Sequence, residues 1–259
     1  MNLYYRELGS GEPVIILHGL FGTGDNWMNV ARALSQEQRV ILPDMPNHGG
    51  SPHAPGMDYA SQARAVVGFL DELGVDRVSI IGHSMGGKAA MAASLLYPGR
   101  IERLAVVDIA PKRYEPSHTQ ILSAMEKVHE QAPATRSEAD RILESGGIAP
   151  AAVRAFLLKS YSPGGEGSEG ARGGWKLNFG VIRDEYPHIL DWPDFGPAQF
   201  DGSVAAIYGE DSGYVTADDF SLFASMFPSV TLHPVEGAGH WLHAQRPETV
   251  IRLISETLK

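Results

Sequence analysis

The feature that most constrains this chain is residues 78–87, which read Val-Ser-Ile-Ile-Gly-His-Ser-Met-Gly-Gly. An apolar, β-branched run ends in Gly82-x-Ser84-x-Gly86, and the residues that follow have a helical pattern. Strand, sharp turn and helix in this order are the setting that a G-x-S-x-G nucleophile elbow requires. The flanking glycines let the strand and the helix approach each other around a strained central residue. We expect an exposed Ser84 hydroxyl, and because the motif is short, a catalytic interpretation requires a base, an acid and an oxyanion hole elsewhere.

The rest of the chain alternates between strand and helix patterns. Apolar stretches with strand character occur at 3–8, 14–17, 40–42, 78–83, 104–108, 204–209 and 230–235. Helical patterns lie between most of them, at 25–34, 58–73, 85–96 and 217–226, and a last helix is expected from Pro247. Strands that alternate with helices predict a mostly parallel sheet with helices on both faces.

The alternation is interrupted in the middle of the chain. Residues 112–201 contain expected helices at 117–131, 137–145 and 151–161, and no convincing buried strand. The glycine-rich tract 164–174 lacks the Lys-Ser/Thr ending of a phosphate loop, so we interpret it as a flexible hinge or surface linker. Because ligands of open α/β sheets bind beyond the carboxyl ends of the strands, an insertion there should cover the site. We predict a core formed by 1–111 and 202–259, with 112–201 as a helical cap.

Composition excludes several classes of protein. The 259 residues suit one large α/β domain with an inserted subdomain, and a formal net charge of −10 argues against nucleic-acid binding. No apolar run reaches the ~18 residues of a membrane-spanning helix, so we expect no membrane partner. The N-terminus lacks a basic region followed by an apolar region, which predicts a cytoplasmic protein without a signal peptide. The absence of cysteine excludes a thiolate nucleophile and disulfides.

His240 is the best candidate for the base. It follows the last expected strand, and Gly237 and Gly239 let its loop fold tightly toward the elbow. Its late position fits the hydrolase order of nucleophile, acid and histidine. The other nine histidines have weaker context: two lie in glycine loops beside the expected site, one lies at a helix entry, and the rest have no comparable setting (His18, His83; His243; His48, His53, His118, His129, His188, His233).

Two aspartates compete for the role of the acid. The usual position, a few residues after the strand 204–208, holds Ser212, one residue beyond Asp211. Asp108 ends the strand that follows the elbow helix, where its carboxylate would reach a histidine from the last loop. An apolar setting makes an unpaired carboxylate costly there, although a purely structural Asp108 is also conceivable. We favour Asp108 and keep Asp211 as the alternative; Asp44, before a glycine loop, fits a structural role.

An oxyanion hole requires two backbone N–H groups. In this motif one comes from the residue after the nucleophile, Met85, and the other from the loop after an early strand, where Leu20 is the candidate. Ser84 would attack an ester or thioester carbonyl and His240 would transfer the proton, a mechanism that implies no metal and no organic cofactor. Phe21, His83 and Trp241 are expected beside the reacting atoms as part of the substrate pocket.

These segments together resemble the bacterial α/β-hydrolase-fold carboxylesterases of the YbfF-like branch. The matching residues lie in five stretches that cover most of the core, at 18–27, 44–51, 82–88, 107–111 and 237–241. The resemblance implies hydrolysis of short- to medium-chain acyl esters or acyl-CoA thioesters. It also supports Asp108, because members of the branch have no acid where Ser212 stands, while the neighbouring Asp211 keeps the choice open.

Other functions share these motifs. Cofactor-free haloperoxidases or perhydrolases and carbon–carbon bond hydrolases use the same Ser-His-Asp set, whereas haloalkane dehalogenases and epoxide hydrolases need an Asp at the position of Ser84. Some hydrolase folds serve as receptors for small ligands, which the complete set of catalytic candidates argues against. Nothing in the sequence sets an oligomeric state.

Overall fold

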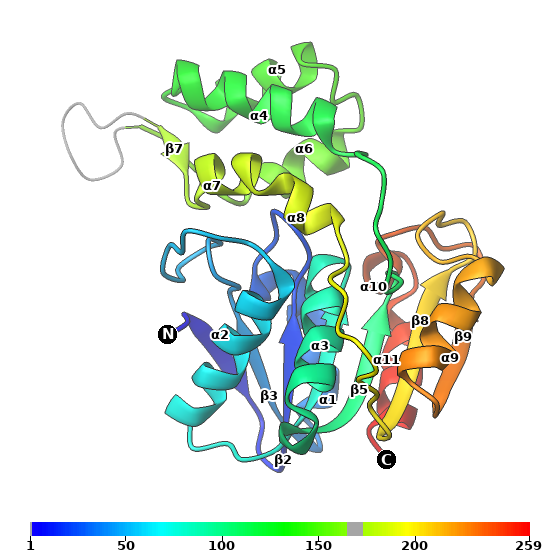
Figure 1. Cartoon of the computed structure of the whole chain (residues 1–259). Coiled ribbons are helices and arrows are strands. Elements are labelled where there is room, and N and C mark those ends of the chain that lie inside the picture. Colours follow the sequence, from blue (N-terminus) through cyan, green and yellow to red (C-terminus); the bar gives the residue numbers. More distant parts are fainter. Residues whose placement is uncertain (1, 165–172) are drawn as a thin grey trace.

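A seven-stranded sheet forms the centre of the molecule (Figure 1). The computed structural model describes residues 2–164 and 173–259, so most of the glycine-rich tract lies outside the described residues. The strand order is β1-β3-β2-β4-β5-β8-β9; β1 is antiparallel to β3, and all other neighbouring pairs are parallel. The strands are β1 (Tyr5–Leu8), β2 (Glu12–Leu17), β3 (Gln38–Pro43), β4 (Val78–His83), β5 (Ile101–Val107), β8 (Ser203–Gly209) and β9 (Val230–Val235).

Strand β4 is buried along its whole length because it lies between β2 and β5 in the middle of the sheet. A parallel strand with helices on both faces carries apolar residues continuously rather than alternately, as Val78, Ile80 and Ile81 do. The carboxyl end of β4 therefore places the turn at Ser84 at the centre of the sheet edge.

Helices cover both faces of the sheet, as the sequence predicts (Figure 1). One core packs the sheet against α1 and α11 around the buried Trp27, and the other packs it against α2, α3 and α9. The bounds are α1 (Met28–Leu34), α2 (Tyr59–Glu72), α3 (Met85–Leu96), α9 (Phe220–Met226), α10 (Leu242–Gln245) and α11 (Pro247–Thr257). Helix α3 is buried from Met85 to Leu95, so it is held from every side rather than presenting one face to solvent.

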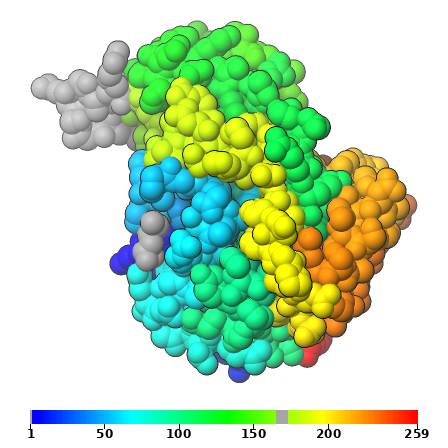
Figure 2. Space-filling view, viewed as in Figure 1, coloured from blue at the N-terminus to red at the C-terminus, as the bar shows by residue number. Residues whose placement is uncertain are grey.

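A group of five helices, α4 to α8, lies above the carboxyl edge of the sheet and is called the helical layer below (Figures 1 and 2). Its members are α4 (Thr119–Gln131), α5 (Arg136–Ser145), α6 (Ala151–Leu158), α7 (Phe179–Asp184) and α8 (Tyr186–Leu190). The sequence predicts no convincing buried strand in this region, and the structure contains one short, partly buried antiparallel pair there, β6 (Tyr161–Ser162) and β7 (Gly174–Trp175). Strands of two residues are too short to produce an apolar alternation that a sequence could reveal. The cap boundaries stay a prediction.

A capping box fixes the start of α5. The Thr135 hydroxyl accepts a hydrogen bond from the Glu138 amide, and the Glu138 carboxylate accepts one from the Thr135 amide. This arrangement satisfies two amides that a helix start leaves without partners. None of the helices in the described part of the chain is long and apolar enough to cross a membrane.

Candidate active site

Ser84 occupies the sharp turn between β4 and α3, with φ 53° and ψ −121°. A non-glycine residue at positive φ costs of order 1–3 kcal/mol, so the surrounding structure must hold it there. The Ser84 amide donates to the Val107 carbonyl at 3.0 Å, which ties the turn to β5. A methyl group added at Gly86 would collide with the Leu17 carbonyl oxygen, and one at Gly82 would collide with Gly86. The two glycines of the motif are therefore needed for close approach of backbones.

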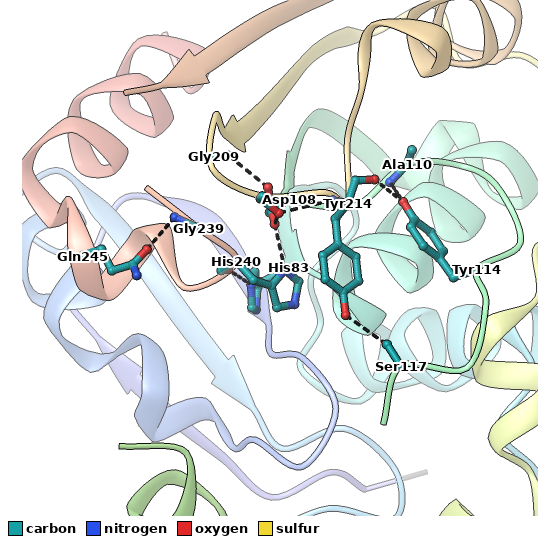
Figure 3. A network of polar contacts seen from close by, with 11 residues as sticks. His83, Asp108, Ala110, Tyr114, Ser117, Gly209, Tyr214, Gly239, His240 and Gln245 are labelled. Atoms are coloured by element: carbon teal, nitrogen blue, oxygen red, sulfur yellow. Dashed lines mark hydrogen bonds and ion pairs between the residues drawn. The ribbon is translucent and has the colours of Figure 1, made fainter. Parts of the chain in front are cut away.

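Asp108 follows β5 and is completely buried (Figure 3). Its Oδ1 accepts a hydrogen bond from the Gly209 amide at 2.9 Å. Its Oδ2 lies 2.7 Å from His240 Nδ1 and accepts a hydrogen bond from the Ser212 hydroxyl at 2.5 Å. Three donors supply the compensation that a buried carboxylate requires.

His240 lies in the loop after β9, with its imidazole held between two partners (Figure 3). The hydrogen bond to Asp108 places the proton on Nδ1, since a carboxylate only accepts, and this leaves Nε2 for chemistry. The Tyr214 ring stacks on the imidazole with centroids 4.0 Å apart and planes 18° apart. His240 and Ser84 line the same cavity. Among the described residues no hydrogen bond joins them, and such bonds often tighten only when substrate binds.

The structure distinguishes between the two aspartates that compete for contact with His240. Asp211 is exposed, and its backbone amide donates to the Ala238 carbonyl. Asp108, not Asp211, is therefore the carboxylate that contacts His240. Asp44 accepts hydrogen bonds from the amides of Gly24 and Gly50, which gives it the structural position that a strand-end aspartate before a glycine loop suggests.

The two expected oxyanion donors border the same space. Met85 is the first residue of α3, so its N–H has no partner within the helix. Leu20 lies beside Ser84 along the cavity walls, and no hydrogen bond within the described part of the chain uses its N–H. Two amides without partners at the N-terminus of a helix suit a developing negative charge.

The three expected pocket residues, Phe21, His83 and Trp241, all line the cavity that contains Ser84 and His240. Phe21 has φ 64°, so it, Ser84 and Asp108 are three of the five described non-glycine residues at positive φ. Such strain tends to gather at functional sites. His83 is buried, and its Nε2 donates to the His240 carbonyl at 2.9 Å, so it positions the loop of His240.

Burial keeps the neighbouring imidazoles neutral. Desolvation lowers the pKa of His18, His118 and His243 to about 4 and that of His48 to about 3. The pKa of His83 is also lowered well below its usual value, first by desolvation and then by the neighbouring His240 and His243. At neutral pH these rings therefore place no positive charge beside the Asp108–His240 pair.

Sequence reasoning missed three contributors to this site. Ser212 holds the usual acid position in the sequence, and that position is a usable signal for a residue that contacts Asp108. Tyr214, which stacks on His240, left no signal in the sequence. Lys88, one turn after Ser84 on α3, is 1% exposed, and desolvation lowers its pKa to about 7.

Ser84 lies at the junction of two cavities. The larger, of about 290 Å³, is bordered by His240 and by apolar side chains of the helical layer such as Val153 and Phe156. The smaller, of about 30 Å³, is bordered by Met85 and Lys88. Among the described residues, no cluster of three or more His, Asp or Glu side chains could hold a metal ion.

Comparisons with known proteins identify the family of the chain. The family model described as alpha/beta hydrolase fold matches residues 12–247. Esterase YbfF of Escherichia coli (strain K12) is 38% identical over 96% of this chain and 94% of that protein. The sn-1-specific diacylglycerol lipase ABHD11 of Xenopus tropicalis is 34% identical over 96% of this chain and 79% of that protein.

A solved structure gives the same result. A marine microorganism esterase superposes with a TM-score of 0.93 at 36% identity, and the match covers 99% of both chains. Because the superposition covers 99% of both chains, it includes the core and the helical layer. The chain therefore belongs to the α/β-hydrolase family, in the branch that resembles YbfF, and is a carboxylic ester hydrolase.

Proposed function

We propose that this protein is a serine carboxylesterase that works through an acyl-enzyme. The observation that carries the proposal is the 2.7 Å contact between His240 Nδ1 and the buried Asp108, at a cavity that also contains Ser84. An imidazole oriented in this way has its Nε2 available to take the proton of a serine hydroxyl.

The reaction follows from these positions. Ser84 Oγ attacks the ester carbonyl while His240 Nε2 takes its proton, and the N–H groups of Met85 and Leu20 stabilise the oxyanion. His240 then gives the proton to the leaving oxygen, and the carbon–oxygen bond of the ester breaks. A water molecule deprotonated by His240 attacks the acyl-enzyme, and the proton returns to Ser84 Oγ as the acid leaves. Asp108 holds the imidazole tautomer and stabilises the imidazolium throughout.

The substrate we propose is a short- to medium-chain acyl ester, with acyl-CoA thioesters as a second class. The larger cavity lies at the lower end of the ~300–1,000 Å³ range of ligand pockets, which favours small esters. Its apolar walls include Ile121, Val153 and Phe156, all from the helical layer. We accordingly propose that residues 112–201 act as a cap over the site.

Hydrolysis of p-nitrophenyl esters with acyl chains of increasing length, and of the matching acyl-CoAs, tests this function. We expect turnover of the short esters and a loss of roughly 10⁴-fold or more for His240→Ala, because this substitution removes the base proposed to take the Ser84 proton. The exposed His53 provides a control, and His53→Ala should leave the rates unchanged. Turnover that survives in His240→Ala would overturn the proposal.

A further inference from the structure

The two cavities at Ser84 differ in the residues that border them. Ser84 and Leu20 line both, which places the reacting carbonyl at their junction. His240 borders only the larger cavity, and Met85 borders only the smaller one. A bound ester must extend in two directions from its carbonyl carbon, with its acyl chain on one side and its alcohol on the other.

The position of His240 decides between the two directions. In the proposed reaction His240 must deliver a proton to the leaving oxygen, so the alcohol has to lie where His240 is accessible. The Tyr214 ring, which borders the smaller cavity, covers one face of the imidazole, and of the two cavities His240 borders only the larger. Of the two cavities, the larger is therefore the one in which a leaving oxygen would meet the imidazole.

The smaller cavity is narrow, and its wall is held firmly. Its volume of about 30 Å³ equals the share of roughly one water molecule in the liquid. The end of α8 forms part of the wall, and the Tyr59 hydroxyl donates to the Ile189 carbonyl at 2.6 Å. The buried Lys88 Nζ donates to the carbonyls of Leu190 and Asp191 at 2.9 and 2.8 Å. Two buried donors therefore hold this wall against expansion.

We propose that the smaller cavity is the acyl subsite and the larger cavity the alcohol subsite, so that the enzyme selects esters of short acids with larger, apolar alcohols. The inference rests on the proposed serine esterase mechanism. An acetyl group, whose methyl is about the size of one water molecule, fits the smaller cavity, whereas the larger one accepts an alcohol several times that size. A longer acyl chain must displace the wall formed by Ile189 and its neighbours.

A pair of isomeric esters tests the assignment directly. Hexyl acetate and ethyl hexanoate contain the same atoms with the ester reversed, so they differ only in which side of the carbonyl is long. We expect kcat/KM for hexyl acetate to exceed that for ethyl hexanoate at least about tenfold, since one misplaced methylene in a tight pocket is worth ~10-fold or more. A ratio of one or below overturns the assignment.

Two truncations, one in each cavity, should give a crossed pattern. Ile189→Ala enlarges the smaller cavity and should raise kcat/KM for ethyl hexanoate severalfold while hexyl acetate changes little. Val153→Ala removes a wall of the larger cavity and should lower kcat/KM for hexyl acetate with little effect on ethyl hexanoate. The opposite pattern reverses the two subsites. If the wild-type enzyme hydrolyses neither ester, the proposed function itself fails; if it prefers ethyl hexanoate, only the subsite assignment does.

Discussion

The sheet edge and the helical layer build the same site by different means. At the sheet edge, each reacting group is fixed by hydrogen bonds and backbone conformation, as with the three donors to Asp108 and the strained turn of Ser84. The helical layer contributes side chains that border the cavity through apolar contact, such as Ile121 and Phe156. From this difference we expect the sheet edge to carry the proposed chemistry and the helical layer to set the selectivity. Substitutions in the two regions should therefore affect different kinetic constants.

The largest expected effect is at the sheet edge, where Asp108→Asn should lower kcat about 10⁴-fold. An amide in place of the carboxylate favours the wrong imidazole tautomer and leaves the imidazolium without its counter-charge. Asp211→Asn is the matched control, because that carboxylate is exposed and it is Asp108 that pairs with His240, so its kcat should stay within about twofold. Steady-state kinetics on p-nitrophenyl acetate measures both. If Asp211→Asn rather than Asp108→Asn loses kcat, the assignment of Asp108 as the acid is wrong.

A smaller effect is expected in the helical layer, where Phe156→Ala should raise KM for hexyl acetate about fivefold. The Phe156 ring borders the larger cavity beside Trp241, with centroids 5.9 Å apart, so its loss removes apolar contact with the bound ester. Because that contact is made equally before and during reaction, kcat should change by less than about twofold. A drop in kcat comparable to that of Asp108→Asn would erase the distinction between the two regions.

The remaining comparison concerns stability rather than rate, at Lys88, which links the core to the end of the helical layer. Burial lowers its pKa to about 7, below the ~10.4 of an unfolded chain, so between these values the unfolded chain binds more protons. Stability conferred at this site is therefore lowest below pH 7 and rises from pH 7 toward pH 10. Lys88→Met fills a similar volume without a titrating group.

Urea unfolding of both proteins at pH 6.5 and pH 9 measures this contribution. We expect the unfolding free energy of the wild type, relative to Lys88→Met, to increase by of order 1–2 kcal/mol between the two pH values. A relative stability that falls as pH rises would mean that the ammonium is held charged in the fold by the carbonyls of Leu190 and Asp191.

Much of the sheet edge could be predicted because it depends on local sequence. The glycines around Ser84 indicate that backbone segments approach closely there. The alternation of strands and helices predicts which loops meet at the carboxyl edge of the sheet. His240 could be predicted in the same way, because it follows the last strand and the glycines at 237 and 239. Spacing alone could not choose between Asp108 and Asp211, since both follow neighbouring strands, and only the three-dimensional path of each chain segment brings one carboxylate to the imidazole.

The remaining features arise from contacts between residues far apart in the chain. Tyr214 reaches His240 through a loop that has no periodic pattern, and Lys88 bonds carbonyls 102 and 103 residues away. The helices of the layer are amphipathic, but their sequences do not reveal which side chains border the cavity. The division of that cavity into two parts likewise depends on how α8 returns to the core.

Covalent labelling shows whether Ser84 is the nucleophile. Wild-type protein and Ser84→Ala are each treated with a fluorophosphonate and weighed intact, with circular dichroism used to verify that the variant is folded. We expect one adduct on the wild type and none on Ser84→Ala, because the proposed activated hydroxyl lies at this turn. An adduct of the same mass on folded Ser84→Ala would contradict this assignment.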